Sequence, residues 1–256
     1  MSATIALSLP AGNRTPMRTV AVAIICKTPI AGKSKTRLSP PLQPEECAAI
    51  SACFITDLAN TIGELDSASA AGYAVYTPAG SEAALRGLLP ATFQLVLQGE
   101  GDLGDRLFQG VIDLLAAGHA GAILVNSDSP TLPPAILQAA VEAVLGGDRM
   151  VISPAIDGGY TLIGLSRPHQ RLFQEIPWST EIVFQLTLER AREISLPTVT
   201  LDTWYDIDDA ASFAMLEAEL DGTRPGFSNP KVPMREAPAT RNFLTRRHAA
   251  VSTRDC

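Results

Sequence analysis

Apolar runs and amphipathic segments alternate along the chain from residue 19 to residue 220. Short apolar runs typical of buried strands occupy 19–25, 73–77, 93–98, 120–126, 150–155, 160–165 and 198–201. Between them, apolar residues recur every three or four positions and predict helices over 44–62, 81–89, 103–118, 133–145, 180–193 and 209–220. Because strands and helices alternate, we expect an α/β domain with a mainly parallel sheet covered by helices on both faces.

The two ends of the chain lack this pattern. Residues 222–256 hold seven Lys or Arg and two Asp or Glu, with scattered prolines and no sustained apolar period. Residues 1–17 are similarly irregular. We therefore expect one domain over 18–221, between a disordered N-terminal extension at 1–17 and a basic, disordered or loosely attached tail at 222–256.

Composition narrows the class of protein. The net charge is −7, which argues against a protein that coats nucleic acid. No apolar run approaches the length of a membrane span. The four cysteines form no CxxC pair, as expected of a reduced, cytoplasmic protein. We expect no nucleic-acid or membrane partner, and the sequence leaves a homodimer open.

The loop after the first predicted strand is strongly basic. It contains Lys27, Gly32, Lys33, Lys35, Thr36 and Arg37. In a parallel sheet, ligands bind beyond the carboxyl ends of the strands. Lysine and arginine side chains suit phosphate groups there, and glycine permits an unusual backbone. The loop predicts an anion site, although a solvated basic loop is the alternative.

Acidic residues follow the fourth strand and the last one. The segment "NSDSPTLP" places Asp128 directly after a fully apolar strand, and "DTWYDIDD" places Asp206 and Asp208 on one side of an extended segment. Such carboxylates can hold Mg²⁺ or Mn²⁺ together with phosphate oxygens. The alternatives are a simple turn at Asp128 and a helix cap at Asp208 or Asp209.

Three further motifs lie in loops. In "GEGDLGDRL" we expect small residues that let a ligand approach the backbone, within a site formed by Gly101, Asp102, Gly104 and Arg106, with a helix cap at Asp102 as the alternative. In "DGGY" and "IPWST" we expect a substrate platform made by Asp157, Gly158, Gly159, Tyr160, Trp178, Ser179 and Thr180. A core tryptophan beside a helix cap is the alternative for the second of these.

Taken together and in order, these motifs resemble one family. The pattern KxPxxGxxKTRL, GDLGxRL, SDSPTLP, DGGYxLIGL, IPWST and a late DxD is similar to the DUF2064 family over residues 18–220. That family comprises GT-A-superfamily transferases, including glycosyltransferases linked to arsenosugar biosynthesis. The first motif also resembles 2-phospho-lactate guanylyltransferases and, more distantly, molybdenum-cofactor guanylyltransferases.

The resemblance implies a nucleotide-diphosphate-sugar-transferase fold, a Rossmann-type three-layer sandwich, with a nucleotide donor and a divalent metal. It places Lys35, Arg37 and Asp128 in the catalytic centre. It also implies that Gly101, Asp102, Gly104 and Arg106 line the nucleoside of the donor. The chain departs from the family pattern at two points. Residues 126–128 read Asn-Ser-Asp in place of DxD, and Asp209 replaces a threonine in the late motif.

The function expected is the transfer of a sugar from a nucleoside-diphosphate sugar to a small-molecule acceptor. A nucleotidyltransferase that releases pyrophosphate is the first alternative. A nucleotide-binding regulator without catalysis is the second, because the altered metal motifs permit it.

Overall fold

The computed structural model describes residues 19–252, and side chains up to residue 250. Its centre is a seven-stranded sheet in the order β3-β2-β1-β4-β6-β5-β7. Only β6 is antiparallel to its neighbours. The strands are β1 (Val20–Lys27), β2 (Ala70–Thr77), β3 (Gln94–Leu97), β4 (Gly121–Asn126), β5 (Met150–Pro154), β6 (Tyr160–Leu165) and β7 (Thr198–Thr200).

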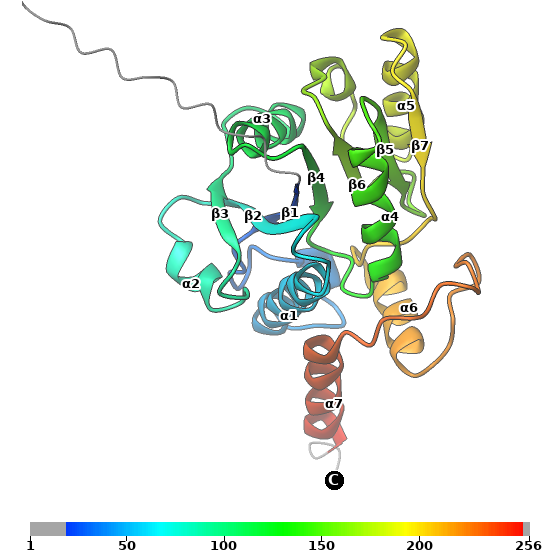
Figure 1. Ribbon diagram of the computed structural model, residues 1–256. Coiled ribbons are helices and arrows are strands. Elements are labelled where there is room, and N and C mark those ends of the chain that lie inside the picture. The colour runs from blue at the N-terminus through cyan, green and yellow to red at the C-terminus, as the bar shows by residue number, and fades with distance from the viewer. Residues whose placement is uncertain (1–18, 253–256) are drawn as a thin grey trace, which may run out of the picture.

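Helices cover both faces of this sheet (Figure 1). One face is covered by α1 (Pro44–Gly63), α2 (Glu82–Arg86), α4 (Pro134–Leu145), α6 (Ala210–Leu220) and α7 (Pro238–Ser252). The other is covered by α3 (Leu103–Ala116), α5 (Val183–Glu193) and the short 3-10 helix η2 (Gln170–Phe173). The α/β class and the mainly parallel sheet are confirmed.

The alternation of side chains along β1 explains the two cores. Val22 and Ile24 belong to the core beneath α1 and α4, whereas Ala21 and Ala23 belong to the core beneath α3. All four side chains are fully buried. A central parallel strand covered on both faces must be apolar at every position, which is why the run is uninterrupted.

The prediction of a disordered or loosely attached tail is wrong for residues 222–252. These residues end in α7, which lies against α1 (Figure 1). Ala237 is fully buried and Leu244 is 5% exposed in the core on that side of the sheet. The predicted extension at 1–17 and the last four residues lie outside the described part of the chain.

A buried carboxylate on α1 explains why α7 is attached. Asp57, which is fully buried, accepts hydrogen bonds from the Ala239 amide at 2.8 Å, the Thr240 amide at 2.8 Å and the Thr240 hydroxyl at 2.7 Å. The first free amides of α7 are thus capped by a residue far away in sequence. Arg235 adds a two-pronged pair to Glu64 on the exposed side, at 2.7 Å for each contact.

The topology brings several loops to one edge of the sheet. The carboxyl ends of β1, β4, β5 and β7 and the start of β6 all meet there. Within residues 19–252, no helix is both long enough and apolar enough to cross a membrane.

Candidate functional site

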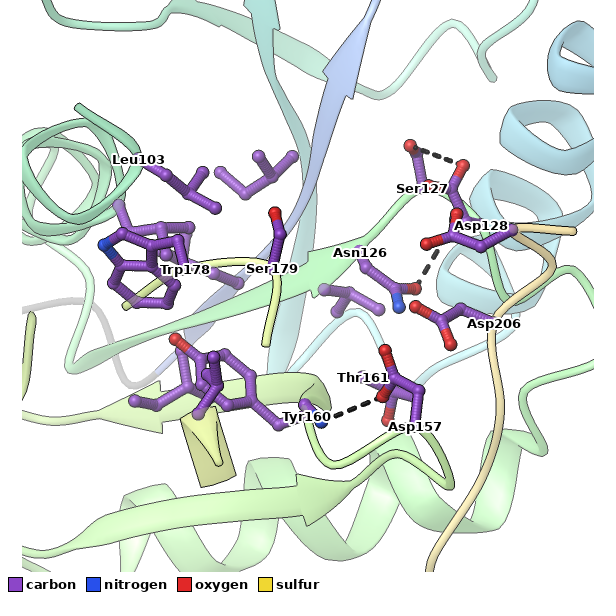
Figure 2. Close-up of a pocket in the computed structure, with 18 of the residues that line it drawn as sticks. Leu103, Asn126, Ser127, Asp128, Asp157, Tyr160, Thr161, Trp178, Ser179 and Asp206 are labelled. Atoms are coloured by element: carbon purple, nitrogen blue, oxygen red, sulfur yellow. Dashed lines mark hydrogen bonds between the residues drawn. The ribbon is translucent and has the colours of Figure 1, made fainter. Parts of the chain in front are cut away.

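Four aspartates converge at this edge from three different loops. Asp128 follows β4, Asp157 lies between β5 and β6, and Asp206 and Asp208 lie in the extended segment before α6. Figure 2 shows Asp128, Asp157 and Asp206 facing a common space. Hydrogen bonds join the segments that carry Asp128 and Asp206. Among them, the Ile207 amide donates to the Asp128 carbonyl at 3.0 Å, and the Ser129 hydroxyl donates to the Tyr205 carbonyl at 2.7 Å.

Lys35 lies between two of these carboxylates. Its ammonium is 2.8 Å from an Asp128 oxygen, 2.8 Å from an Asp208 oxygen and 2.7 Å from the carbonyl of Ile207. The Lys35 side chain is only 8% exposed. Burial alone lowers the pKa of Lys35, but Asp128 and Asp208 outweigh it, so the pKa is raised and the ammonium stays charged.

The basic loop contains a short helical turn after β1. Residues Thr36–Leu38 form a 3-10 helix, and Lys35 at its start has a φ of 48°, in the left-handed region. Lys35 therefore turns inward to the carboxylates, while the Arg37 side chain is 73% exposed and only 4.0 Å from Asp208. Gly32 has a φ of +72°, the conformation for which glycine was expected.

A cavity of about 300 Å³ opens on one side of the aspartates. We call it the acidic cavity. It is lined by Ile25, Leu103, Leu107, Leu124, Val125, Asn126, Ser127, Asp128, Asp157, Gly159, Tyr160, Thr161, Ile163, Trp178, Ser179, Thr180, Val183, Asp206 and Asp208. Its walls thus combine carboxylates with apolar and aromatic side chains, which are well separated in Figure 2.

A second cavity, of about 270 Å³, lies beside the basic loop. We call it the basic cavity. It is lined by Lys27, Lys33, Ser34, Lys35, Thr36, Arg37, Ser51, Ser127, Asp128 and Asp208. The two cavities share Ser127, Asp128 and Asp208, so these residues form the boundary between a basic and an acidic compartment.

The acidic compartment carries more negative charge than Lys35 balances. The pKa of Asp206 is raised to about 7 by burial and then by the neighbouring charges of Asp157, Asp208 and Asp128, with Lys35 opposing the shift. Carboxylates that repel one another in this way are stabilised by a bound cation.

The three predicted metal ligands, Asp128, Asp206 and Asp208, all line the acidic cavity. Asp128 and Asp206 face the same space, and Lys35 pairs with both Asp128 and Asp208. In the described part of the chain, no three His, Cys, Asp or Glu side chains form a ready-made metal site. The arrangement fits a hard cation that takes two carboxylates from the protein and completes its shell with phosphate oxygens and water.

The residues predicted to line a nucleoside lie elsewhere. Asp102 caps α3 by accepting a hydrogen bond from the Asp105 amide at 2.9 Å, and Arg106 donates to the Asp102 carbonyl at 3.1 Å. A Cβ on Gly104 would lie 2.4 Å from the Phe173 carbonyl oxygen, so this glycine permits close packing. Gly101, with a φ of +97°, forms the turn before the cap. None of these four residues lines either cavity, and the cap alternative describes Asp102.

The predicted substrate platform is brought together. Asp157, Gly159, Tyr160, Trp178, Ser179 and Thr180 all line the acidic cavity. The Asp157 carboxylate accepts a hydrogen bond from the Gly159 amide at 2.8 Å. Gly158 contributes through close packing, since a Cβ there would lie 2.0 Å from the Glu181 carbonyl oxygen. Ser179 and Thr180 do not cap α5, which begins with no side-chain cap after Ile182.

Sequence reasoning missed Asn126, Ser127 and Thr161, which also line the acidic cavity. Asn126 and Ser127 could have been found from their position beside Asp128 at the end of a fully apolar strand. Thr161 lies one residue inside β6, and no local signal in the sequence marked it.

Three comparisons place these findings among known proteins. A family model for uncharacterized proteins conserved in bacteria, DUF2064, matches residues 63–180. A comparison with curated proteins found no match. A crystal structure from Desulfovibrio desulfuricans G20, described as a candidate nucleotide-diphospho-sugar transferase, is 25% identical with a TM-score of 0.76, covering 91% of this chain and 97% of that one.

Two cytidylyl-transferring enzymes share the fold at lower identity. A 4-diphosphocytidyl-2C-methyl-D-erythritol synthase is 10% identical with a TM-score of 0.54, covering 80% of this chain and 99% of that one. A CMP:2-keto-3-deoxy-manno-octonic acid synthetase complexed with CTP is 10% identical with a TM-score of 0.51, covering 79% and 98%. The chain therefore resembles the DUF2064 family over residues 63–180, as the motifs predicted, and has the fold of nucleotide-diphospho-sugar transferases.

Proposed function

We propose that the protein is a metal-dependent glycosyltransferase that moves a sugar from a nucleoside-diphosphate sugar to a small-molecule acceptor. The observation that carries this proposal is the pair of adjoining cavities with opposite charge, which share Asp128 and Asp208. The basic cavity takes the donor's phosphates, and the acidic cavity takes the group that attacks the sugar.

The basic cavity supplies what a leaving pyrophosphate group needs. Lys27, Lys33 and Arg37 are exposed and face the cavity with no buried partner to hold them. Negative charge develops on the nucleoside diphosphate as the glycosidic bond breaks, and positioned cations stabilise that charge in the transition state. Lys35, which was predicted to be catalytic, pairs with Asp128 and Asp208 and would hold these two carboxylates in place.

Asp128 and Asp206 would hold the Mg²⁺ or Mn²⁺ ion. When bound, the ion neutralises the donor's phosphate oxygens as a Lewis acid. The chain's own groups then orient the acceptor: the Asp157 carboxylate, fixed by the Gly159 amide, is placed to accept a hydrogen bond from the attacking hydroxyl.

The charge of the acidic cavity favours sugar transfer over nucleotidyl transfer. Four aspartates line it, and its lining includes no Lys, Arg or His among the described residues. A phosphorylated acceptor, which a guanylyltransferase-like reaction requires, would face these carboxylates with no Lys, Arg or His side chain of the lining to pair with it. An uncharged acceptor that reacts through a hydroxyl group would not be repelled by these carboxylates.

A nucleotidyltransferase that releases pyrophosphate is the second candidate. It is supported by the sequence of residues 126–128, which keeps a single aspartate as in the nucleotidyltransferase branch of the superfamily. A nucleotide-binding regulator without turnover is the third.

Phosphorus NMR distinguishes the three. The protein is incubated with Mg²⁺, an acceptor mixture and either a panel of nucleoside-diphosphate sugars or a panel of nucleoside triphosphates. Release of nucleoside diphosphate from a sugar donor is expected. Release of pyrophosphate from a triphosphate would establish the second candidate instead, and binding of nucleotide with no product from either panel would favour the third.

A further inference from the structure

The acidic cavity contains a buried hydroxyl that has no partner. The Tyr160 oxygen is inaccessible to solvent and forms no hydrogen bond within the described residues. Its ring lines the cavity, and burial raises the pKa of the phenol, so it remains a neutral hydrogen-bond donor. An orphaned buried hydroxyl loses its water hydrogen bonds without replacement, which is costly unless a ligand supplies the partner.

The surroundings of this hydroxyl are apolar and aromatic. The Tyr160 and Trp178 rings lie edge to face, with centroids 6.5 Å apart at an interplanar angle of 78°. Leu103, Leu107 and Ile163 also line the cavity. Figure 2 shows Tyr160, Trp178 and Leu103 grouped at the end away from Asp128 and Asp206.

The two ends of the cavity therefore select different chemical groups. The aromatic end suits a flat apolar ring with one polar atom that can accept a hydrogen bond from Tyr160. The acidic end repels anions and accepts hydroxyl or ammonium groups.

We propose that the acidic cavity binds a ring-bearing molecule without negative charge, whose ring packs against Trp178. Its polar substituent displaces the side chains that cover the Tyr160 hydroxyl in the ligand-free structure and pairs with that hydroxyl. The inference rests on the proposed function in one respect: this molecule would be the acceptor, with its reactive hydroxyl or amine at the aspartate end. Phosphorylated and carboxylated molecules of the same size are excluded from the cavity.

Dissociation constants measured by ligand-observed NMR on the full chain test the proposal. The probes share one ring and differ in charge: benzyl alcohol, benzylamine, benzoate and phenyl phosphate. A fifth probe, para-hydroxybenzyl alcohol, adds a polar atom at the far end of the ring. The variant is Tyr160→Phe, and the matched control is Tyr76→Phe, whose hydroxyl pairs with Glu82 away from both cavities.

The neutral and cationic probes are expected to bind at least about tenfold more tightly than the two anions, because like charges oppose the anions. The para-hydroxyl group should tighten binding about three- to tenfold in the parent protein, and this gain should vanish in Tyr160→Phe but persist in Tyr76→Phe. Equal binding of anions, an unchanged gain in Tyr160→Phe, or no binding of any ring probe would each overturn the proposal.

The same samples separate this inference from the proposed function. Each is also titrated with a nucleoside diphosphate and Mg²⁺. Charge-selective ring binding without nucleotide binding would retain the cavity's ligand class and reject the transferase. Nucleotide binding without ring binding would reject the ligand class proposed for the cavity and would leave the proposed function standing.

Discussion

The ammonium of Lys35 lies 2.8 Å from a carboxylate oxygen of Asp128, in a side chain that is 8% exposed. The two residues come from the loops after β1 and β4, which are neighbouring strands. Asp208 joins the same ammonium from the segment before α6. One buried positive charge thus holds three loops together at the point where the two cavities meet.

Lys35→Met removes this charge and keeps most of the side-chain volume. We expect the free energy of unfolding without metal to fall by about 1–3 kcal/mol, because two partly buried carboxylates lose their partner. Excess Mg²⁺ should stabilise this variant more than the parent. The measurement is urea unfolding with and without Mg²⁺, with the exposed Lys33→Met as the control. A stable Lys35→Met protein that does not respond to Mg²⁺ would contradict the role given to Lys35.

The pKa of Asp206, raised to about 7, makes a prediction about pH. An acid whose pKa is higher in the folded state than in the unfolded state binds more protons when folded, so stability falls as pH rises from about 4 towards the folded pKa. Without metal, the parent should lose about 1–3 kcal/mol relative to Asp206→Asn between about pH 5 and pH 8. Urea unfolding of both proteins at several pH values checks this. A difference in stability that does not change with pH would show that Asp206 is not perturbed.

The three hydrogen bonds to Asp57 predict that α7 contributes to stability. Asp57→Ala should cost about 2–4 kcal/mol, because it leaves two buried amides and a hydroxyl without an acceptor. Removal of residues 236–256 should also lower the melting temperature clearly. Asp113→Ala on α3, which loses one side-chain contact to Gln109, is the control and should change stability by less than about 0.5 kcal/mol. An unchanged melting temperature after the truncation would mean that α7 does not stabilise the domain in solution.

Tyr160→Phe should behave in the opposite way from most tyrosine replacements. Removing a buried hydroxyl without a partner is expected to raise the free energy of unfolding of the ligand-free protein by about 1 kcal/mol. Tyr73→Phe is the contrasting control, since the Tyr73 hydroxyl lies 2.8 Å from Nε2 of His119 and its loss should destabilise the protein. Chemical denaturation measures the free energy of unfolding of both variants. A loss of stability in Tyr160→Phe would show that the Tyr160 hydroxyl has a hydrogen-bond partner in the folded protein.

Much of the fold and part of the site could be predicted because the relevant signals are local. The continuous apolar run of β4 identifies a central strand, and Asp128 follows it directly at the edge where ligands bind. The same reasoning located Asp157, Asp206 and the basic loop. These residues share a site because parallel strands end at the same edge.

The features that the sequence did not predict depend on contacts between residues that are distant in the sequence, or on backbone angles that no sequence pattern indicates. The docking of α7 depends on Asp57, which is more than a hundred residues earlier and looks like any polar position on an amphipathic helix. Lys35 turns inward because of a left-handed backbone angle at a non-glycine residue, which sequence patterns do not indicate. The glycines of "GEGDLGDRL" suggest a ligand loop, but Gly104 is needed for packing against Phe173.

The affinity for a nucleoside-diphosphate sugar, measured with and without Mg²⁺, tests the central claim most directly. Calorimetric titration compares the parent with Asp128→Asn, using Asp113→Asn on α3 as the control for loss of one charge. If donor phosphates lie in the basic cavity beside a metal held by Asp128, Mg²⁺ should tighten binding at least about tenfold in the parent and in Asp113→Asn, and this gain should disappear in Asp128→Asn. Equal Mg²⁺-dependent binding by the parent and Asp128→Asn would contradict the account.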